Sequence, residues 1–195
     1  LPGVQLTLPS DNWFQNDIHN EGTITVVGDE DGPGQLSLVV GTFYGAEGSS
    51  IDLSGADVVG DVGESGLSLN IECGSYSYGS FYNAGTILTN GGSGTEGGSG
   101  GSVYIDSELV AYNTGAIDAS GGEGSEGNGG GAGSVYLSTD YGSLNNSGDI
   151  NASGGNGTED GGEAGNIDLY VGYTGDILNA GSLNTSGGDG IIGGG

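Results

Sequence analysis

Apolar and polar residues alternate in short runs that recur along the whole chain. Each run follows a glycine, and the six runs are VQLTL (4–8), QLSLVV (35–40), LSLNIE (67–72), SVYID (102–106), SVYLS (134–138) and NIDLY (166–170). A period of two, with Val, Ile and Leu on one side, predicts strands that bury one face. Helical periodicity is absent from the sequence, so the pattern predicts an all-β protein.

A second signature follows these runs: apolar, any residue, Asn, any residue, Gly, any residue, apolar. Its glycines are separated by 33, 30, 30, 33 and 33 residues and are Gly22, Gly55, Gly85, Gly115, Gly148 and Gly181. Its asparagines are Asn20, Asn83, Asn113, Asn146 and Asn179. The second copy has Ile51 as its first apolar residue, Leu53 in place of Asn and Asp57 in place of the last apolar residue.

A repeat of about 32 residues with short strands predicts a single-domain parallel β-helix (β-solenoid), because each unit can bury its apolar side only against its neighbours. We expect about six coils over residues 1–195, degenerate over 1–65 and regular over 66–195. Asparagines stacked at one corner predict an amide ladder. The adjacent glycine column predicts a turn with positive φ.

Glycine-rich segments lengthen the coils at 91–101, 121–133 and 154–165. We expect these segments to protrude as loops, with shorter loops in the first two coils. The chain has 48 Gly and 3 Pro, a composition typical of disorder, but the regular repeat favours a folded solenoid.

The chain has no Lys or Arg and 26 acidic residues, giving a formal net charge of −26. Such a chain repels nucleic acids and anionic lipids, so neither is an expected partner. The sequence has no apolar run near the roughly 20 residues that span a bilayer, so we expect no membrane insertion. Lack of trypsin-like cleavage sites suits an extracellular protein. The single cysteine, Cys73, is expected either to be buried or to cross-link two chains.

In its asparagine column and glycine-rich turns the chain resembles secreted prokaryotic right-handed parallel β-helix proteins of the filamentous adhesin and extracellular fibre or sheath type. The resemblance covers nearly the whole chain and rests on repeat style. It implies an extracellular or cell-surface location. The pectin lyases that share this fold use Arg or Lys as a base, and neither is present here. We therefore expect no enzymatic activity.

The two ends predict head-to-tail assembly. The last unit stops in its glycine loop and the first opens with a strand, so a second copy would place its Gly3 33 residues after Gly165. Repeated contacts of this kind give a filament. The expected assembly residues are Gly3, Val4, Leu6, Leu8, Ile191 and Ile192, and the segment with Trp13 and Phe14 is a candidate partial cap. The predicted function is a structural, self-assembling extracellular filament or sheath subunit whose partner is itself. The alternative is a cell-surface adhesin stalk or passenger segment that binds glycan or divalent cations.

Three further sets of residues are candidate sites. Stacked loop carboxylates could share Ca²⁺, or could simply be solvated, and are Glu96, Glu126, Glu159, Asp160 and Glu163. Asparagines in N-x-Ser/Thr sequons are candidates for glycosylation and are Asn145, Asn151, Asn156 and Asn184. His19 is expected to point outward without a special role, and the tyrosines to pack across strands or to form a sugar-binding stripe.

Overall fold

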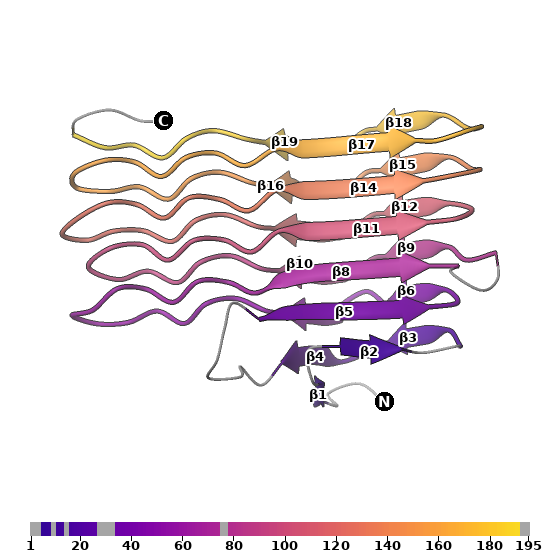
Figure 1. Ribbon diagram of the computed structural model, residues 1–195. Coiled ribbons are helices and arrows are strands. Elements are labelled where there is room, and N and C mark those ends of the chain that lie inside the picture. Colours follow the sequence, from indigo (N-terminus) through magenta and orange to yellow (C-terminus); the bar gives the residue numbers. More distant parts are fainter. Residues whose placement is uncertain (1–4, 9–10, 14–15, 27–33, 75–77, 192–195) are drawn as a thin grey trace.

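The structure, a computed structural model, describes residues 5–8, 11–13, 16–26, 34–74 and 78–191 (Figure 1). The described residues form 19 strands and no helix. Consequently none of the described residues belongs to a helix of the length and apolar character needed to cross a bilayer.

The strands form three parallel sheets. The seven-stranded sheet contains, in order, β1 (Gln5–Leu8), β4 (Thr23–Val26), β7 (Ser50–Asp52), β10 (Thr86–Leu88), β13 (Ala116–Asp118), β16 (Ile150–Asn151) and β19 (Leu183–Asn184). The long-strand sheet contains β2 (Asp11–Trp13), β5 (Gln35–Val40), β8 (Ser68–Cys73), β11 (Val103–Ser107), β14 (Val135–Thr139) and β17 (Ile167–Val171). The asparagine sheet contains β3 (Ile18–Asn20), β6 (Phe43–Gly45), β9 (Phe81–Asn83), β12 (Ala111–Asn113), β15 (Leu144–Asn146) and β18 (Ile177–Asn179).

The chain visits the long-strand, asparagine and seven-stranded sheets in that fixed order, so each circuit lies on the one before it (Figure 1). This arrangement is a β-solenoid, and the predicted fold class is confirmed. Two less regular circuits precede four regular ones that begin at β8. Every pairing between neighbouring strands is parallel, as a coil of stacked circuits requires.

The interior is filled by columns of apolar side chains, one from each circuit. In the long-strand sheet Leu69, Val103 and Val135 pair in sequence and are each no more than 1% exposed. The seven-stranded sheet contributes a column of isoleucines, namely Ile24, Ile51, Ile87, Ile117 and Ile150. All these residues belong to one hydrophobic cluster. The alternation in the sequence therefore did identify the buried face of the regular strands.

The second coil carries its copy of the asparagine signature earlier than the sequence predicted. Gly45 pairs with both Asn20 and Asn83, so Gly45 and not Leu53 occupies the asparagine column. A Cβ at Gly45 would lie 2.7 Å from Asn83 Oδ1, so any larger residue here would require the Asn83 side chain to move.

Ile51 and Asp57 also lie outside their predicted columns. Ile51 pairs with Ile24 and Ile87 in the seven-stranded sheet, whereas Phe81 belongs to the asparagine sheet. Asp57 lies on the segment after β7. The assignment of a second signature at 51–57 was wrong because two different corners of the coil share a similar spacing of apolar residues and glycine.

The first alternating run was assigned to the wrong sheet. β1 pairs with β4 in the seven-stranded sheet, with Leu6 beside Ile24, and the long-strand sheet begins instead with β2. A second copy's Gly3 placed 33 residues after Gly165 would therefore not join equivalent strands, and that argument for the join was wrong. Trp13, expected in a partial cap, lies in the edge strand β2, and Phe14 lies outside the described residues.

The glycine column at the corner does not have the predicted positive φ. Among the described residues, positive φ angles occur at Gly48, Gly60, Gly74 and Gly175. Glycine is required in the column because neighbouring circuits approach closely. A Cβ on Gly115 would overlap the carbonyl oxygen of Gly85, and a Cβ on Gly148 would overlap that of Gly115.

The glycine-rich segments stack into an ordered extension on one side of the coil (Figure 1). We call residues 54–66, 90–101, 120–133 and 153–165 the glycine extension; each segment has an outward arm and a return arm. Hydrogen bonds between circuits recur at every third residue, since the N–H groups of Gly91 and Gly94 donate to the carbonyls of Ser120 and Glu123. Three residues is the period of a polyproline II helix, whereas a strand has a period of two. The segment 54–66 stacks with the others, so the expected shortening of the loop was wrong for the second coil.

A line of peptide hydrogen bonds runs through the extension along the coil axis. The N–H of Gly98 donates to Gly92 at 2.8 Å, Gly122 to Gly98 at 2.8 Å and Gly130 to Gly122 at 2.9 Å. The line continues through Gly155, Gly162 and Gly188. It alternates between outward and return arms, so it ties the two layers of the extension to each other.

Candidate functional site

The last circuit, β17 to β19, leaves apolar residues of the interior columns uncovered. Leu144 and Ile150 are 0% and 1% exposed. Ile177 and Leu183 pair with them one circuit later and are 48% and 42% exposed. A further circuit stacked on this end would bury both side chains, and full burial of a Leu or Ile is worth about 1.5–3 kcal/mol.

The asparagine ladder has a direction along the coil axis. Asn83 Nδ2 donates to Asn113 Oδ1 at 2.8 Å, Asn113 to Asn146 at 2.7 Å and Asn146 to Asn179 at 2.7 Å. The predicted ladder is confirmed for these four residues. Asn179 Nδ2 donates to the carbonyl of Gly181 at 3.0 Å, and no asparagine lies above it among the described residues to accept its second N–H.

Asn20 lies in the same column but outside the line of amide bonds, because Gly45 separates it from the ladder. Its Nδ2 donates to the carbonyl of Ser50 at 2.9 Å, and its Oδ1 accepts the N–H of Gly22 at 3.1 Å. The first circuit therefore presents an amide oxygen at the end of the column opposite to the amide nitrogen of the last circuit.

The expected assembly residues fall into three groups. Leu6 and Leu8 lie in β1 and pair with β4. Ile191 is 83% exposed beyond the last strand. Gly3, Val4 and Ile192 lie outside the described residues.

A second polar ladder follows the seven-stranded sheet. Asn151 Nδ2 donates to Asp118 Oδ1 and Asn184 Nδ2 donates to Asn151 Oδ1, both at 3.0 Å. The sequence did not predict this ladder, although an acid or amide at the same position of consecutive repeats could have indicated it. Two of the sequon asparagines thus already have side-chain partners. Of the other two, Asn145 is half-buried and Asn156 is exposed, and glycosylation of all four stays a prediction.

The candidate calcium ligands are spread over the edge of the glycine extension. All five are exposed, and they come from three different circuits: Glu96, Glu126, Glu159, Asp160 and Glu163. Among the residues that the structure describes, no three Asp, Glu, His or Cys side chains form a group that could hold a metal ion. A calcium site there stays a prediction without support from this geometry.

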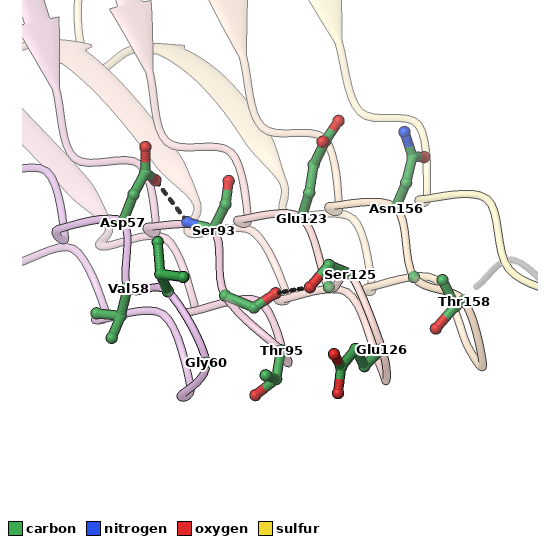
Figure 2. A pocket seen from close by; sticks show the side chains of 14 residues that line it. Asp57, Val58, Gly60, Ser93, Thr95, Glu123, Ser125, Glu126, Asn156 and Thr158 are labelled. Carbon is green, nitrogen blue, oxygen red and sulfur yellow. Dashed lines mark hydrogen bonds between the residues drawn. The ribbon is translucent and has the colours of Figure 1, made fainter.

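The glycine extension carries an open groove of about 650 Å³ that crosses several circuits. One wall is a row of four residues, one from each circuit: Asp57, Ser93, Glu123 and Asn156 (Figure 2). We call these four the Asp57 row. Asp57 Oδ1 accepts the N–H of Ser93 at 2.7 Å. A second groove of about 430 Å³ borders the same row, so the row is a polar ridge between two glycine-lined channels. The sequence did not predict these grooves, because they exist only when the loops are stacked.

Aromatic side chains stack along the outer face of the asparagine sheet. The ring centroids of His19 and Tyr44 are 4.5 Å apart, those of Tyr44 and Tyr82 5.0 Å, and those of Tyr82 and Tyr112 5.6 Å. His19 points outward as expected, and its neighbour in the column is Tyr44. Because the ring faces cover one another, this geometry favours packing across strands over a flat stripe for sugar rings.

Asp106 lies on the outer face of the long-strand sheet and accepts a hydrogen bond from Ser138 Oγ. Burial raises the pKa of Asp106, the bond from Ser138 opposes this shift, and the carboxylates of Asp140 and Glu72 add to it. The sequence did not indicate this cluster because its members come from three different circuits of the coil.

Cys73 faces the interior from β8 and is 4% exposed, with a free thiol. Burial raises the pKa of this thiol to about 12. The expectation of an inward-facing cysteine is confirmed. A disulfide to another chain would require the thiol to leave the core.

We expect the Cys73 thiol to react with a soluble disulfide reagent about 100-fold more slowly in the folded chain than in urea, since reaction requires local opening. The thiol ionises near pH 9.0 when unfolded and near 12 when folded, so its contribution to stability is complete below pH 9.0 and is lost as the pH rises toward 12. Rates of thiol modification at pH 8 measure the first effect. Equal rates in the two states would contradict the buried position.

No protein-family model, curated protein or solved structure matches the chain. Evidence for function therefore comes from the sequence and the structure of this chain alone.

Proposed function

We propose that this protein is a structural, self-assembling subunit of an extracellular filament or sheath, and that copies stack end to end along the solenoid axis. The observation that carries this proposal is the uncovered last circuit, where the interior columns and the asparagine ladder stop at exposed Ile177, Leu183 and Asn179. An open sheet edge of this kind favours pairing with another chain.

The first circuit offers the complementary groups. Ile18 and Asn20 in β3 occupy the same columns as Ile177 and Asn179 in β18. The amide oxygen at Asn20 and the free amide hydrogen at Asn179 are an acceptor and a donor in one column. A stack would therefore continue both the apolar column and the polar ladder, always with the same polarity.

The charge of the chain sets the conditions for assembly. Each copy carries a formal net charge of −26, and stacked copies bring carboxylates of adjacent circuits close together. Salt screens such repulsion, with a Debye length of about 8 Å at 0.15 M. We therefore propose that filaments form at moderate salt or mildly acidic pH. The same charge supports a role without nucleic acid or membrane as a partner.

Electron microscopy and sedimentation of the purified chain test this function. We expect fibres from the parent protein and only monomers from a variant with Ile177→Asp and Leu183→Asp, which places two charges on the open end. The matched control carries Val59→Asp and Val62→Asp, two exposed positions on the glycine extension, and should still form fibres. A parent protein that remains a short monomeric rod across salt and pH would contradict the filament.

The groove beside the Asp57 row supports a second candidate, a cell-surface adhesin stalk or passenger segment. A channel lined by glycine backbone and by uncharged and acidic polar groups suits a neutral glycan chain. Monomeric rods that bind immobilised glycan would favour this candidate over the filament.

A further inference from the structure

The number of strands in each sheet constrains how two copies can join. The chain visits the seven-stranded, long-strand and asparagine sheets in turn, and of the described strands the first, β1, and the last, β19, both belong to the seven-stranded sheet. In an uninterrupted coil, a strand of the seven-stranded sheet is always followed by one of the long-strand sheet. Two copies of the described fold placed end to end violate this order.

The conflict is local to one position. Inside the chain, β4 is the neighbour of β1 on one side. In a continuous stack, the strand next to β4 must belong to the same circuit as the strands next to β2 and β3. Those strands would be β17 and β18 of the adjoining copy, and their own circuit ends in β19. Both β1 and the adjoining β19 therefore require the same place beside β4.

If both strands stayed, the seven-stranded sheet would gain one strand at each join that the other two sheets lack. The gap in those sheets would be one strand spacing, about 4.8 Å. Across such a gap neither the hydrogen bonds of β2 and β3 nor the amide ladder could form. The exposed Ile177 would also remain uncovered at the join.

We propose that β1 is an exchangeable strand: at each join it leaves β4, and β19 of the adjoining copy takes its place. This inference rests on the filament function proposed above. Leu183 of the incoming strand takes the register position of Leu6 beside Ile24, so one leucine replaces another. In the seven-stranded sheet the exchange replaces the four-residue strand β1 with the two-residue strand β19. It adds new pairing in the other two sheets, with β17 against β2 and β18 against β3, and this added pairing favours the exchange.

The exchange gives β1 a role in the unassembled chain. Until the exchange, β1 occupies the place beside β4 that β19 of the adjoining copy must take, so two copies cannot stack in register before β1 leaves. Under this proposal Leu6 and Leu8 belong to the strand that assembly displaces and do not themselves contact the adjoining copy.

A reversible staple tests the exchange. Thr7 and Thr25 are register partners in β1 and β4, so Thr7→Cys and Thr25→Cys in a Cys73→Ala background place two thiols at a distance suited to a disulfide. We expect the oxidised variant to remain monomeric and the same sample to form fibres after reduction. The control, Thr86→Cys with Ala116→Cys, staples β10 to β13 within one chain and should form fibres in both states.

The outcomes of this experiment separate failure of the β1 exchange from failure of the filament itself. Fibres that grow equally fast from the oxidised Thr7–Thr25 staple would overturn the exchange of β1 while leaving the filament intact. Absence of fibres from the unstapled Cys73→Ala parent would overturn the filament, and the exchange with it. In a second measurement, Leu6→Asp should loosen β1 and shorten the lag before fibre growth several-fold, and an unchanged lag would also count against the exchange.

Discussion

Replacement of Asn113 by leucine is expected to lower the free energy of unfolding by about 2–5 kcal/mol, although leucine has a similar shape and is more apolar. Asn113 is 0% exposed, accepts a hydrogen bond from Asn83 and donates to Asn146 and to the carbonyl of Gly115 at 2.9 Å. The substitution leaves buried donors and acceptors in the circuits below and above without partners, and each such group costs about 1–3 kcal/mol. Urea denaturation followed by circular dichroism measures the loss.

The matched control for Asn113 is Asn145→Leu on the next circuit. Asn145 pairs with Tyr112 on the outer face of the same sheet, is half-buried and lies outside the amide ladder. We expect this substitution to change the free energy of unfolding by no more than about 0.5 kcal/mol. Equal losses from the two variants would show that the ladder contributes nothing beyond ordinary packing.

The regular circuits were predictable because each position of the repeat has the same structural role in every circuit and therefore keeps the same type of residue. Asn83, Asn113 and Asn146 recur at the spacing of the circuits, and the structure bonds each to the next. The alternating runs after Gly66 likewise identified the buried columns. In these circuits, residues at the same position of consecutive repeats are also register partners in adjacent circuits. The sequence repeat therefore predicts the register of the strands.

The irregular circuits could not be predicted in this way. Gly45 stands where asparagine would have marked the column, and Ile51 with Gly55 imitates the missing signature at a different corner. The run at 4–8 has the same alternation as the long strands. A period of two shows which face is buried but not which sheet a strand joins, so only the pairing of β1 with β4 could place it.

The two grooves of the glycine extension could not be predicted from the sequence for a different reason. The Asp57 row combines Asp, Ser, Glu and Asn, which share no residue type, and these residues meet because the arms below them stack. The order of the glycine extension did have a signal in the sequence, since glycines recur at intervals of three, at positions 91, 94, 97 and 100. A period of three, which a polyproline II helix also has, distinguishes regularly stacked arms from flexible loops.

Substitution of Gly130 by alanine is expected to destabilise the glycine extension by about 3 kcal/mol or more. A Cβ at Gly130 would overlap the carbonyl oxygen of Gly98, and Gly130 itself donates to Gly122 at 2.9 Å. Both backbones belong to the line of peptide hydrogen bonds, so neither can move away without breaking a bond. We expect faster amide hydrogen exchange at Gly122 and Gly155, and a lower melting temperature.

The adjacent residue supplies the control, because the same substitution at Gly131 meets open space. The nearest heavy atom to a Cβ there is the carbonyl oxygen of Glu163 at 3.8 Å, an ordinary contact distance. Alanine in place of glycine without strain restricts the unfolded chain, so Gly131→Ala should be neutral or stabilising by up to about 1 kcal/mol. If Gly130→Ala and Gly131→Ala had the same effect, the arms would be loose loops and not a close-packed layer, since only close packing distinguishes two neighbouring glycines in one arm.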